Sequence, residues 1–226
     1  MKFRPIILLA GAVLLLGVST ASLPASAANV IQVPECKFAG QALPGIDLRT
    51  TNVSGTDPHW TVTGPANPQP PGTPAVGGPI HAKLTAWTAV SAQWIQPFAT
   101  STVGPYGDAW PNTAVGDYTY TIQFNLPCDP ASYTHLGIVG SIAADNSFRA
   151  YLNGTSNLIA SCATGNCFKS PDGPKHIVTT TSMFKRGLNT ITVVIHNDGN
   201  YTGLAVKAGL TARCGKTCVP HLPTDE

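Results

Sequence analysis

Polar and apolar residues alternate along much of this chain beyond residue 30. The clearest case is Tyr118, Tyr120, Ile122 and Phe124, which are separated by two threonines and a glutamine. A period of two residues places successive side chains on opposite faces of a β-strand. No stretch after residue 30 repeats apolar positions every 3.6 residues over the length of a helix. We therefore expect an all-β fold with almost no helix.

Several strand-like runs recur, separated by clusters of Gly, Pro, Asn and Asp. Their bounds are 60–62, 118–126, 134–142, 148–153, 176–181, 189–196 and 203–212. The β-branched run within 190–195 predicts a central strand, and Gly187 is predicted to form the turn that leads into it. This pattern predicts a β-sandwich.

Residues 142–154 are the most informative segment of the chain. Asp145-Asn146 favours a turn, because short polar side chains bond to nearby backbone groups. Alternation then predicts one face of Phe148, Ala150 and Leu152, and an opposite face of Ser147, Arg149, Tyr151 and Asn153. Asn153-Gly154 is a strong signal for a hairpin turn.

The segment Gly64–Pro79 contains six prolines. Proline lacks the N–H donor that a ladder of β-strands requires, so we expect a long surface loop here. A linker between two domains is the alternative, but residues 36–62 are too few to form a domain of their own. No internal repeat is present, so we expect one domain.

The first 27 residues have the pattern of a secretory signal peptide. Lys2 and Arg4 precede an apolar run, and Ala25-Ser26-Ala27 resembles a cleavage site. An uncleaved membrane anchor is the alternative, but the apolar run is short for a span. We expect residues 28–226 to be secreted, to act in the extracellular space and to have no membrane span after cleavage.

Charge is low and balanced in this mature part. Without Lys2 and Arg4, eleven of the 13 Lys and Arg residues remain against 11 Asp and Glu residues. There is no basic tract, so nucleic acid is not an expected partner.

The mature part contains six cysteines, and an even number in an exported chain indicates disulfides. Six cysteines allow fifteen pairings, and the sequence alone does not choose among them. Cys162 and Cys167 are favoured as a pair that closes a short loop. Cys214 with Cys218 could close a small ring, and Cys36 would then pair with Cys128. A zinc site at Cys214, Cys218 and His221 is a disfavoured alternative, because no second cluster is present.

Several short fragments follow one another in a familiar order. They are Asp57-Pro58-His59-Trp60, Gln93-Trp94-Ile95-Gln96-Pro97, Gly116-Asp117-Tyr118, Ala144-Asp145-Asn146, Leu152-Asn153-Gly154, Gly187-Leu188-Asn189-Thr190 and Thr202-Gly203-Leu204. Together they resemble a family of exported bacterial domains with a galactose-binding-like jelly-roll fold. The resemblance spans nearly all of the mature chain and implies two antiparallel sheets packed face to face.

The resemblance also implies where ligands bind, which is on loops at one end or on a concave sheet face. Some members of the family carry C-terminal surface-sorting tails. This chain has no such tail and has more cysteines than expected, so we expect it to be released.

Aromatic side chains in loops are the first candidates for a sugar site, because a ring can stack on the apolar face of a pyranose. Trp87, Tyr106 and Trp110 lie in a region rich in Gly and Pro and are candidate ligand-binding residues. Burial in the core is the competing interpretation, and it is favoured for Trp60 and Trp94.

Polar candidates for the same site are Asp145, Asn146, Asn153 and Asn197. These side chains can bond sugar hydroxyls, but they can equally satisfy turns and backbone groups. Residues 197–200 favour a simple hairpin turn, with a ligand or calcium site as the alternative. No cofactor is expected beyond a structural calcium, whose ligands the sequence does not name.

Catalytic signals are weak. The only mature glutamates are Glu35 and Glu226, whereas a glycosidase needs two carboxylates with separate roles. No Gly-x-Ser-x-Gly motif is present, and the histidines lack metal-binding spacing.

We therefore expect a non-catalytic carbohydrate-binding module whose partner is a glycan or polysaccharide at the cell surface or in an extracellular matrix. A structural subunit of a matrix, sheath or filament, self-associating through exposed strand edges, is the alternative. A polysaccharide-active enzyme is the second alternative.

Overall fold

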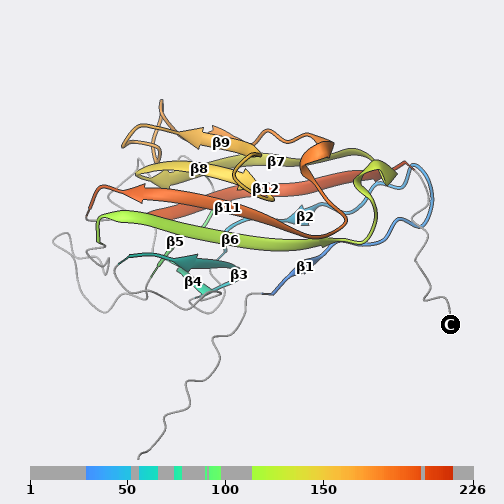
Figure 1. The fold of residues 1–226 in the computed structure, drawn as a ribbon, viewed down its shortest axis with the longest axis horizontal. Coiled ribbons are helices and arrows are strands. Elements are labelled where there is room, and N and C mark those ends of the chain that lie inside the picture. Colours follow the sequence, from blue (N-terminus) through green and yellow to red (C-terminus); the bar gives the residue numbers. More distant parts are fainter. Residues whose placement is uncertain are drawn as a thin grey trace, which may run out of the picture.

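In the computed structural model two mostly antiparallel β-sheets pack against each other, which confirms the expected all-β sandwich (Figure 1). The structure describes residues 29–51, 56–65, 74–77, 90, 92–97, 114–199 and 202–215. Within these ranges the helical elements are the 3-10 turns η2 (Pro130–Ser132) and η3 (Thr181–Met183). None of the helices described there is long and apolar enough to cross a membrane. The predicted signal peptide lies outside the described residues.

The first sheet has the strand order β3-β6-β11-β8-β9. Its strands are β3 (Thr56–Thr63), β6 (Gly116–Leu126), β11 (Gly187–Asn197), β8 (Ser147–Leu152) and β9 (Leu158–Cys162). The short strand β1 (Ile31–Gln32) adds to β6 in parallel. β11 lies between β6 and β8, which confirms the predicted central strand.

The second sheet is built on the long pair β7 (Tyr133–Asp145) and β12 (Gly203–Cys214). β10 (Lys175–His176) pairs with β7, and both β2 (Ile46–Asp47) and β5 (Ile95–Gln96) pair with β12.

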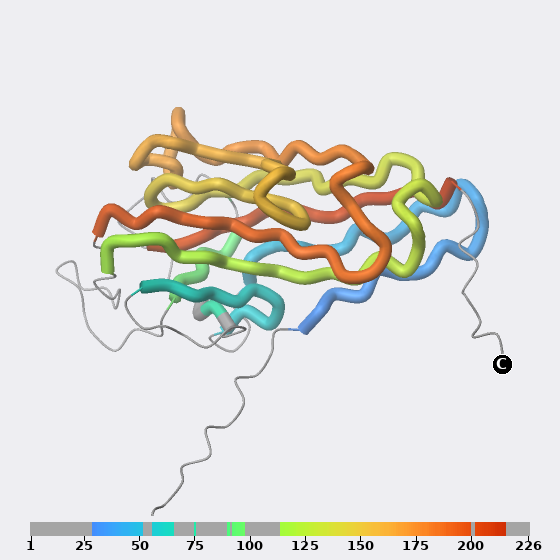
Figure 2. The backbone as a smooth tube through the Cα atoms, in the orientation of Figure 1, coloured from blue at the N-terminus to red at the C-terminus, as the bar shows by residue number. Residues whose placement is uncertain are grey.

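The two sheets lie one behind the other (Figure 2), and hydrogen bonds join them along both sides. On one side, β4 (Pro74–Gly77) pairs with β3 and β5. On the other, the segment after β10 bridges them, because Ile177 N donates to Gly140 O and Val178 N donates to Ile159 O, each at 2.9 Å.

The strand β4 corrects the prediction of a loop over residues 64–79. Pro74 is the first residue of the strand, a position at which proline is tolerated. The ladder of this short strand is therefore compatible with proline at its start.

The core lies between the sheets and follows the alternation in the sequence. Tyr118, Tyr120, Ile122 and Phe124 are all buried on one face of β6, as predicted. Trp60 is also fully buried, and its indole N–H donates to Leu48 O at 3.2 Å. The prediction that this tryptophan belongs to the core is confirmed.

Trp94 is fully buried too, in a second, smaller cluster with Val90, Ala143 and Ala205. Ala143 and Ala205 alternate with residues of the main core along β7 and β12, so this cluster covers the outer face of the second sheet. The prediction of a buried Trp94 is confirmed, although its cluster is separate from the main core.

The turn at 197–200 is not a hairpin, which corrects that prediction. β11 ends at Asn197 in the first sheet, and β12 begins at Gly203 in the second. The chain therefore crosses between sheets here. It crosses in the same way at Asn146, between β7 and β8.

Two disulfides join described cysteines. The predicted Cys162–Cys167 pair is confirmed. Cys214 pairs with Cys36, so the suggested Cys214–Cys218 ring, the Cys36–Cys128 pair and the zinc alternative are wrong. Residues 42–50 run beside β12, which brings Cys36 to the end of that strand. Cys128 is also disulfide-bonded, with a partner outside the described residues.

The two disulfides differ in the length of chain that they enclose, with sequence separations of 178 and 5 residues. In the chain-entropy model, loss of the Cys36–Cys214 bond costs roughly 5 kcal/mol of stability, and loss of the Cys162–Cys167 bond costs roughly 2 kcal/mol. Urea denaturation of the two double-alanine variants measures both values. Equal losses would contradict this ranking.

Candidate functional site

The predicted site residues do not gather in one place within the described structure. Trp87, Tyr106 and Trp110 lie outside the described residues. Of the polar candidates, Asp145, Asn146 and Asn197 lie at the end of the sandwich where the chain crosses between the sheets, and Asn153 follows the other end of β8.

Asn153 is used by the backbone around it. It has a φ of 58°, and the following Gly154 has a φ of 117°, as the predicted Asn-Gly turn requires. The Asn153 amide donates to Met183 O and to Asn189 Oδ1, and its oxygen accepts from Thr190 N at 3.0 Å. These bonds tie the β8–β9 turn to the start of β11.

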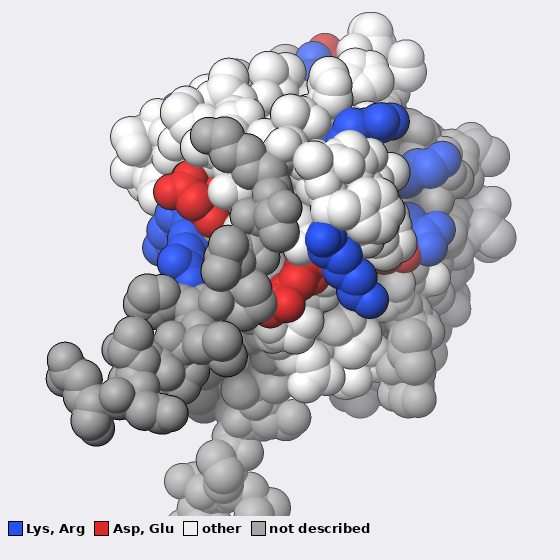
Figure 3. Space-filling model, turned by 90° about the vertical axis from the view of Figure 1, so that its right-hand side faces the viewer, with Lys and Arg blue, Asp and Glu red and all other residues white. Residues whose placement is uncertain are grey.

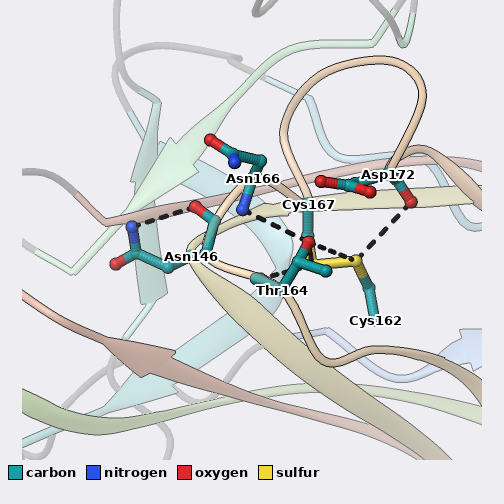
Figure 4. The surroundings of a disulfide bond; sticks show 7 residues. Asn146, Cys162, Thr164, Asn166, Cys167 and Asp172 are labelled. Carbon is teal, nitrogen blue, oxygen red and sulfur yellow. Dashed lines mark hydrogen bonds between the residues drawn. A yellow bond between two sulfur atoms is a disulfide. The ribbon is translucent and has the colours of Figure 1, made fainter.

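Asn146 and Asn197 also organise loops. Asn146 donates to Gly165 O at 3.3 Å and accepts from Asp198 N at 2.8 Å. Figure 4 shows Asn146 beside the loop that the Cys162–Cys167 disulfide closes. Asn197 is fully buried and donates to Ala114 O at 2.9 Å. Ligand binding by these two residues stays a prediction.

Asp145 is a buried carboxyl group. Only 5% of the residue is exposed, and no described residue bonds its buried Oδ1 atom. Burial, followed by the charge of Asp198, raises the pKa of Asp145 to about 7. Ionising this group is costly because burial removes most of the surrounding water and no described donor bonds Oδ1.

A groove of about 630 Å³ lies on the outer face of the first sheet, over β6, β11, β8 and β9. This size is typical of ligand sites. It is lined by Asp117, Ser147, Phe148, Arg149, Tyr151, Thr155, Ser161, Cys162, Ala163, Val194 and His196.

Strand register brings the polar groups of the groove together. Arg149 on β8 lies opposite Val194 of β11 on one side and Ser161 of β9 on the other. His196 of β11 lies opposite Ser147 of β8 and Asp117 of β6. Side chains at such paired positions share one face of the sheet.

His196 stands between two carboxylates at one end of the groove. Its Nδ1 atom is 2.7 Å from Asp117 Oδ1, and its Nε2 atom is 3.6 Å from Asp198 Oδ1. All three side chains are more than half exposed, so these contacts contribute little to stability. They orient the imidazole, and one oxygen of the Asp117 carboxylate already has a hydrogen-bond partner in His196.

The sequence alone does not reveal the groove, although it contains part of the signal. Alternation correctly predicts that Ser147, Arg149 and Tyr151 share the face opposite the buried Phe148, Ala150 and Leu152. It does not indicate that β9 and β11 add Ser161 and His196 to that face. Those neighbours follow from tertiary pairing.

Among the residues that the structure describes, no group of three or more His, Cys, Asp or Glu side chains is placed to hold a metal ion. The expected structural calcium stays a prediction. Comparison of the chain with protein-family models, with curated proteins and with solved structures finds no match in any of the three. The sandwich and the groove are thus the basis for any functional conclusion.

The raised pKa of Asp145 has a consequence for stability. The folded state holds the proton up to about pH 7, whereas the unfolded chain releases it near 3.8. Stability is therefore highest below the unfolded pKa and falls as the pH rises towards 7. Asp145→Asn resembles the protonated group, so it should add up to about 4 kcal/mol at pH 8 and almost nothing at pH 4.

Urea denaturation at both pH values tests this effect. Asp129→Asn is the matched control, because Asp129 is exposed and asparagine also caps the η2 turn. A gain for Asp145→Asn that is the same at pH 4 and pH 8 would contradict the assignment.

Proposed function

We propose that this chain is a non-catalytic glycan-binding domain and that the groove over β6, β11, β8 and β9 holds the sugar. The observation that carries the proposal is the combination of the outward-facing Tyr151 ring, the Arg149 guanidinium and several hydroxyl groups in a single open groove. The sandwich is the fold that a resemblance to galactose-binding-like domains implies, but a fold alone does not establish a function.

The chemistry of the lining suits a sugar. Pyranose rings have apolar C–H faces as well as hydroxyl groups, and the half-buried Tyr151 ring with Val194 supplies an apolar surface. Arg149, Ser147 and Ser161 supply donors and acceptors around it. An open site of this kind binds one short glycan weakly, with a Kd of about 1 µM to 1 mM, and gains strength on a polymer that presents many copies.

Secretion is part of the proposal and is supported by the disulfides. The Cys36–Cys214 and Cys162–Cys167 bonds are typical of proteins that leave the reducing cytosol. Seen from one end, the described surface consists mostly of uncharged residues, with charged side chains scattered between them (Figure 3). Charged side chains scattered in this way form no continuous basic stripe for the many phosphate contacts on which nucleic-acid binding depends.

Catalysis has less support than binding. Asp117 is the one carboxylate among the described residues that line the groove, and it already contacts His196. Hydrolysis of a glycosidic bond needs an acid and a second carboxylate that face the same bond.

Assembly through strand edges also has less support than glycan binding. β10 and β9 are the two ends of the hydrogen-bonded strand order, and the segment after β10 donates from Val178 N to Ile159 O of β9. This bond pairs backbone groups at the edge of β9 that would otherwise be open to a strand of a second subunit in a filament.

Truncation of the aromatic ring tests the proposal. Tyr151→Ala should weaken binding to an immobilised polysaccharide panel by about tenfold, because the ring supplies most of the apolar contact. Phe38→Ala is the matched control, since it removes a ring that is 62% exposed near the Cys36–Cys214 bond, at the opposite end of β12 from the groove.

Isothermal titration calorimetry measures the change in affinity for each polymer of the panel that the wild-type protein binds. An affinity that is unaffected by Tyr151→Ala, or failure of the folded wild-type protein to bind any member of the panel, would contradict the proposal.

A further inference from the structure

We infer that the groove selects acidic polysaccharides, whose carboxylate or sulfate groups pair with Arg149. This inference rests on the proposed function, because it names the class of glycan that the same groove binds. Two observations carry it. Arg149 lies within the groove, and Asp117, the carboxylate that lines the groove, contacts His196 and not Arg149.

Arg149 lies in the middle of the groove. It is exposed, it faces out from β8, and its register partners are the uncharged Val194 and Ser161. Its neighbours along the same face of β8 are Ser147 and Tyr151. The residues directly beside Arg149 on this face of the sheet are therefore uncharged.

No described residue forms an ion pair with Arg149. The one carboxylate that lines the groove, Asp117, lies two strands away on β6 and contacts His196 at 2.7 Å. The positive charge and the five N–H donors of Arg149 are thus available to a ligand.

An arginine fork matches the geometry of a carboxylate or sulfate, with two parallel N–H···O bonds. Tyr151 lies two residues further along β8, roughly 7 Å away on the same face. One acidic sugar can therefore place its ring on Tyr151 and its anionic group on Arg149. The Ser161 hydroxyl, on the strand beside Arg149, is placed to donate to the same anion.

A second basic position provides a matched control. Arg186, with Lys185, lines a separate cavity of about 470 Å³ near η2 and η3. Arg186 precedes β11 while Arg149 lies opposite Val194, so the two positions are roughly 25 Å apart along the strand. Arg149→Gln and Arg186→Gln make the same change of charge at two distant exposed sites.

The experiment measures binding by titration calorimetry to two matched pairs of polymers. Polygalacturonate is compared with its methyl ester, and dextran sulfate is compared with dextran. We expect the acidic member of at least one pair to bind about tenfold more tightly, and Arg149→Gln to remove that preference. Arg186→Gln should leave it unchanged. The pair that shows the preference identifies carboxylate or sulfate as the recognised group.

Equal binding of acidic and neutral polymers would overturn the inference, as would a preference that is lost in Arg186→Gln and kept in Arg149→Gln. If binding is equal but depends on Tyr151, the proposed function stands and only the acidic selectivity fails. If no polymer binds, both fail.

Discussion

The pairing of β11 with β6 on one side and β8 on the other is the interaction on which the rest of the structure depends. Its ladder with β6 runs without a break from Gly187 to Asn197. Because side chains alternate along a strand, this one register places the inward residues in the core and the outward residues in the groove. A slip of one residue would expose Ile191, Val193 and Ile195 and would bury His196.

The end of the sandwich near Asp145 serves a different purpose from the groove beside it. The side-chain amides of Asn146 and Asn197 form hydrogen bonds that hold the two connections crossing between the sheets. Asp145 sits among them as a buried group whose pKa is raised by burial and by Asp198. Asp198 in turn contacts His196 at the edge of the groove. The chain thus places a buried carboxyl group with a raised pKa next to its proposed binding surface.

Much of the fold follows from alternation, and the exceptions have physical causes. Alternation predicts β6, β8 and β11 because each of them buries one face along its whole length. The sequence also predicts parts of β3, β7 and β12, although these strands bury both faces over part of their length. β1, β2 and β5 have two residues each, too few to show a period, and β4 was hidden by Pro74. The Cys36–Cys214 bond depends on chain topology. The groove depends on which strands become neighbours. The alternation within β8 therefore predicts only the residues in the middle of the groove.

The central claim is that the outer face of β6, β11, β8 and β9 binds a glycan. Two-dimensional NMR of the ¹⁵N-labelled protein, titrated with an oligosaccharide of the best-binding polymer, tests it most directly. If the glycan binds in the groove, the changes in amide chemical shift cluster at 147–151, at Ser161 and at 194–196. Shifts confined to the Thr181–Arg186 cavity, or to residues 80–113, would contradict it.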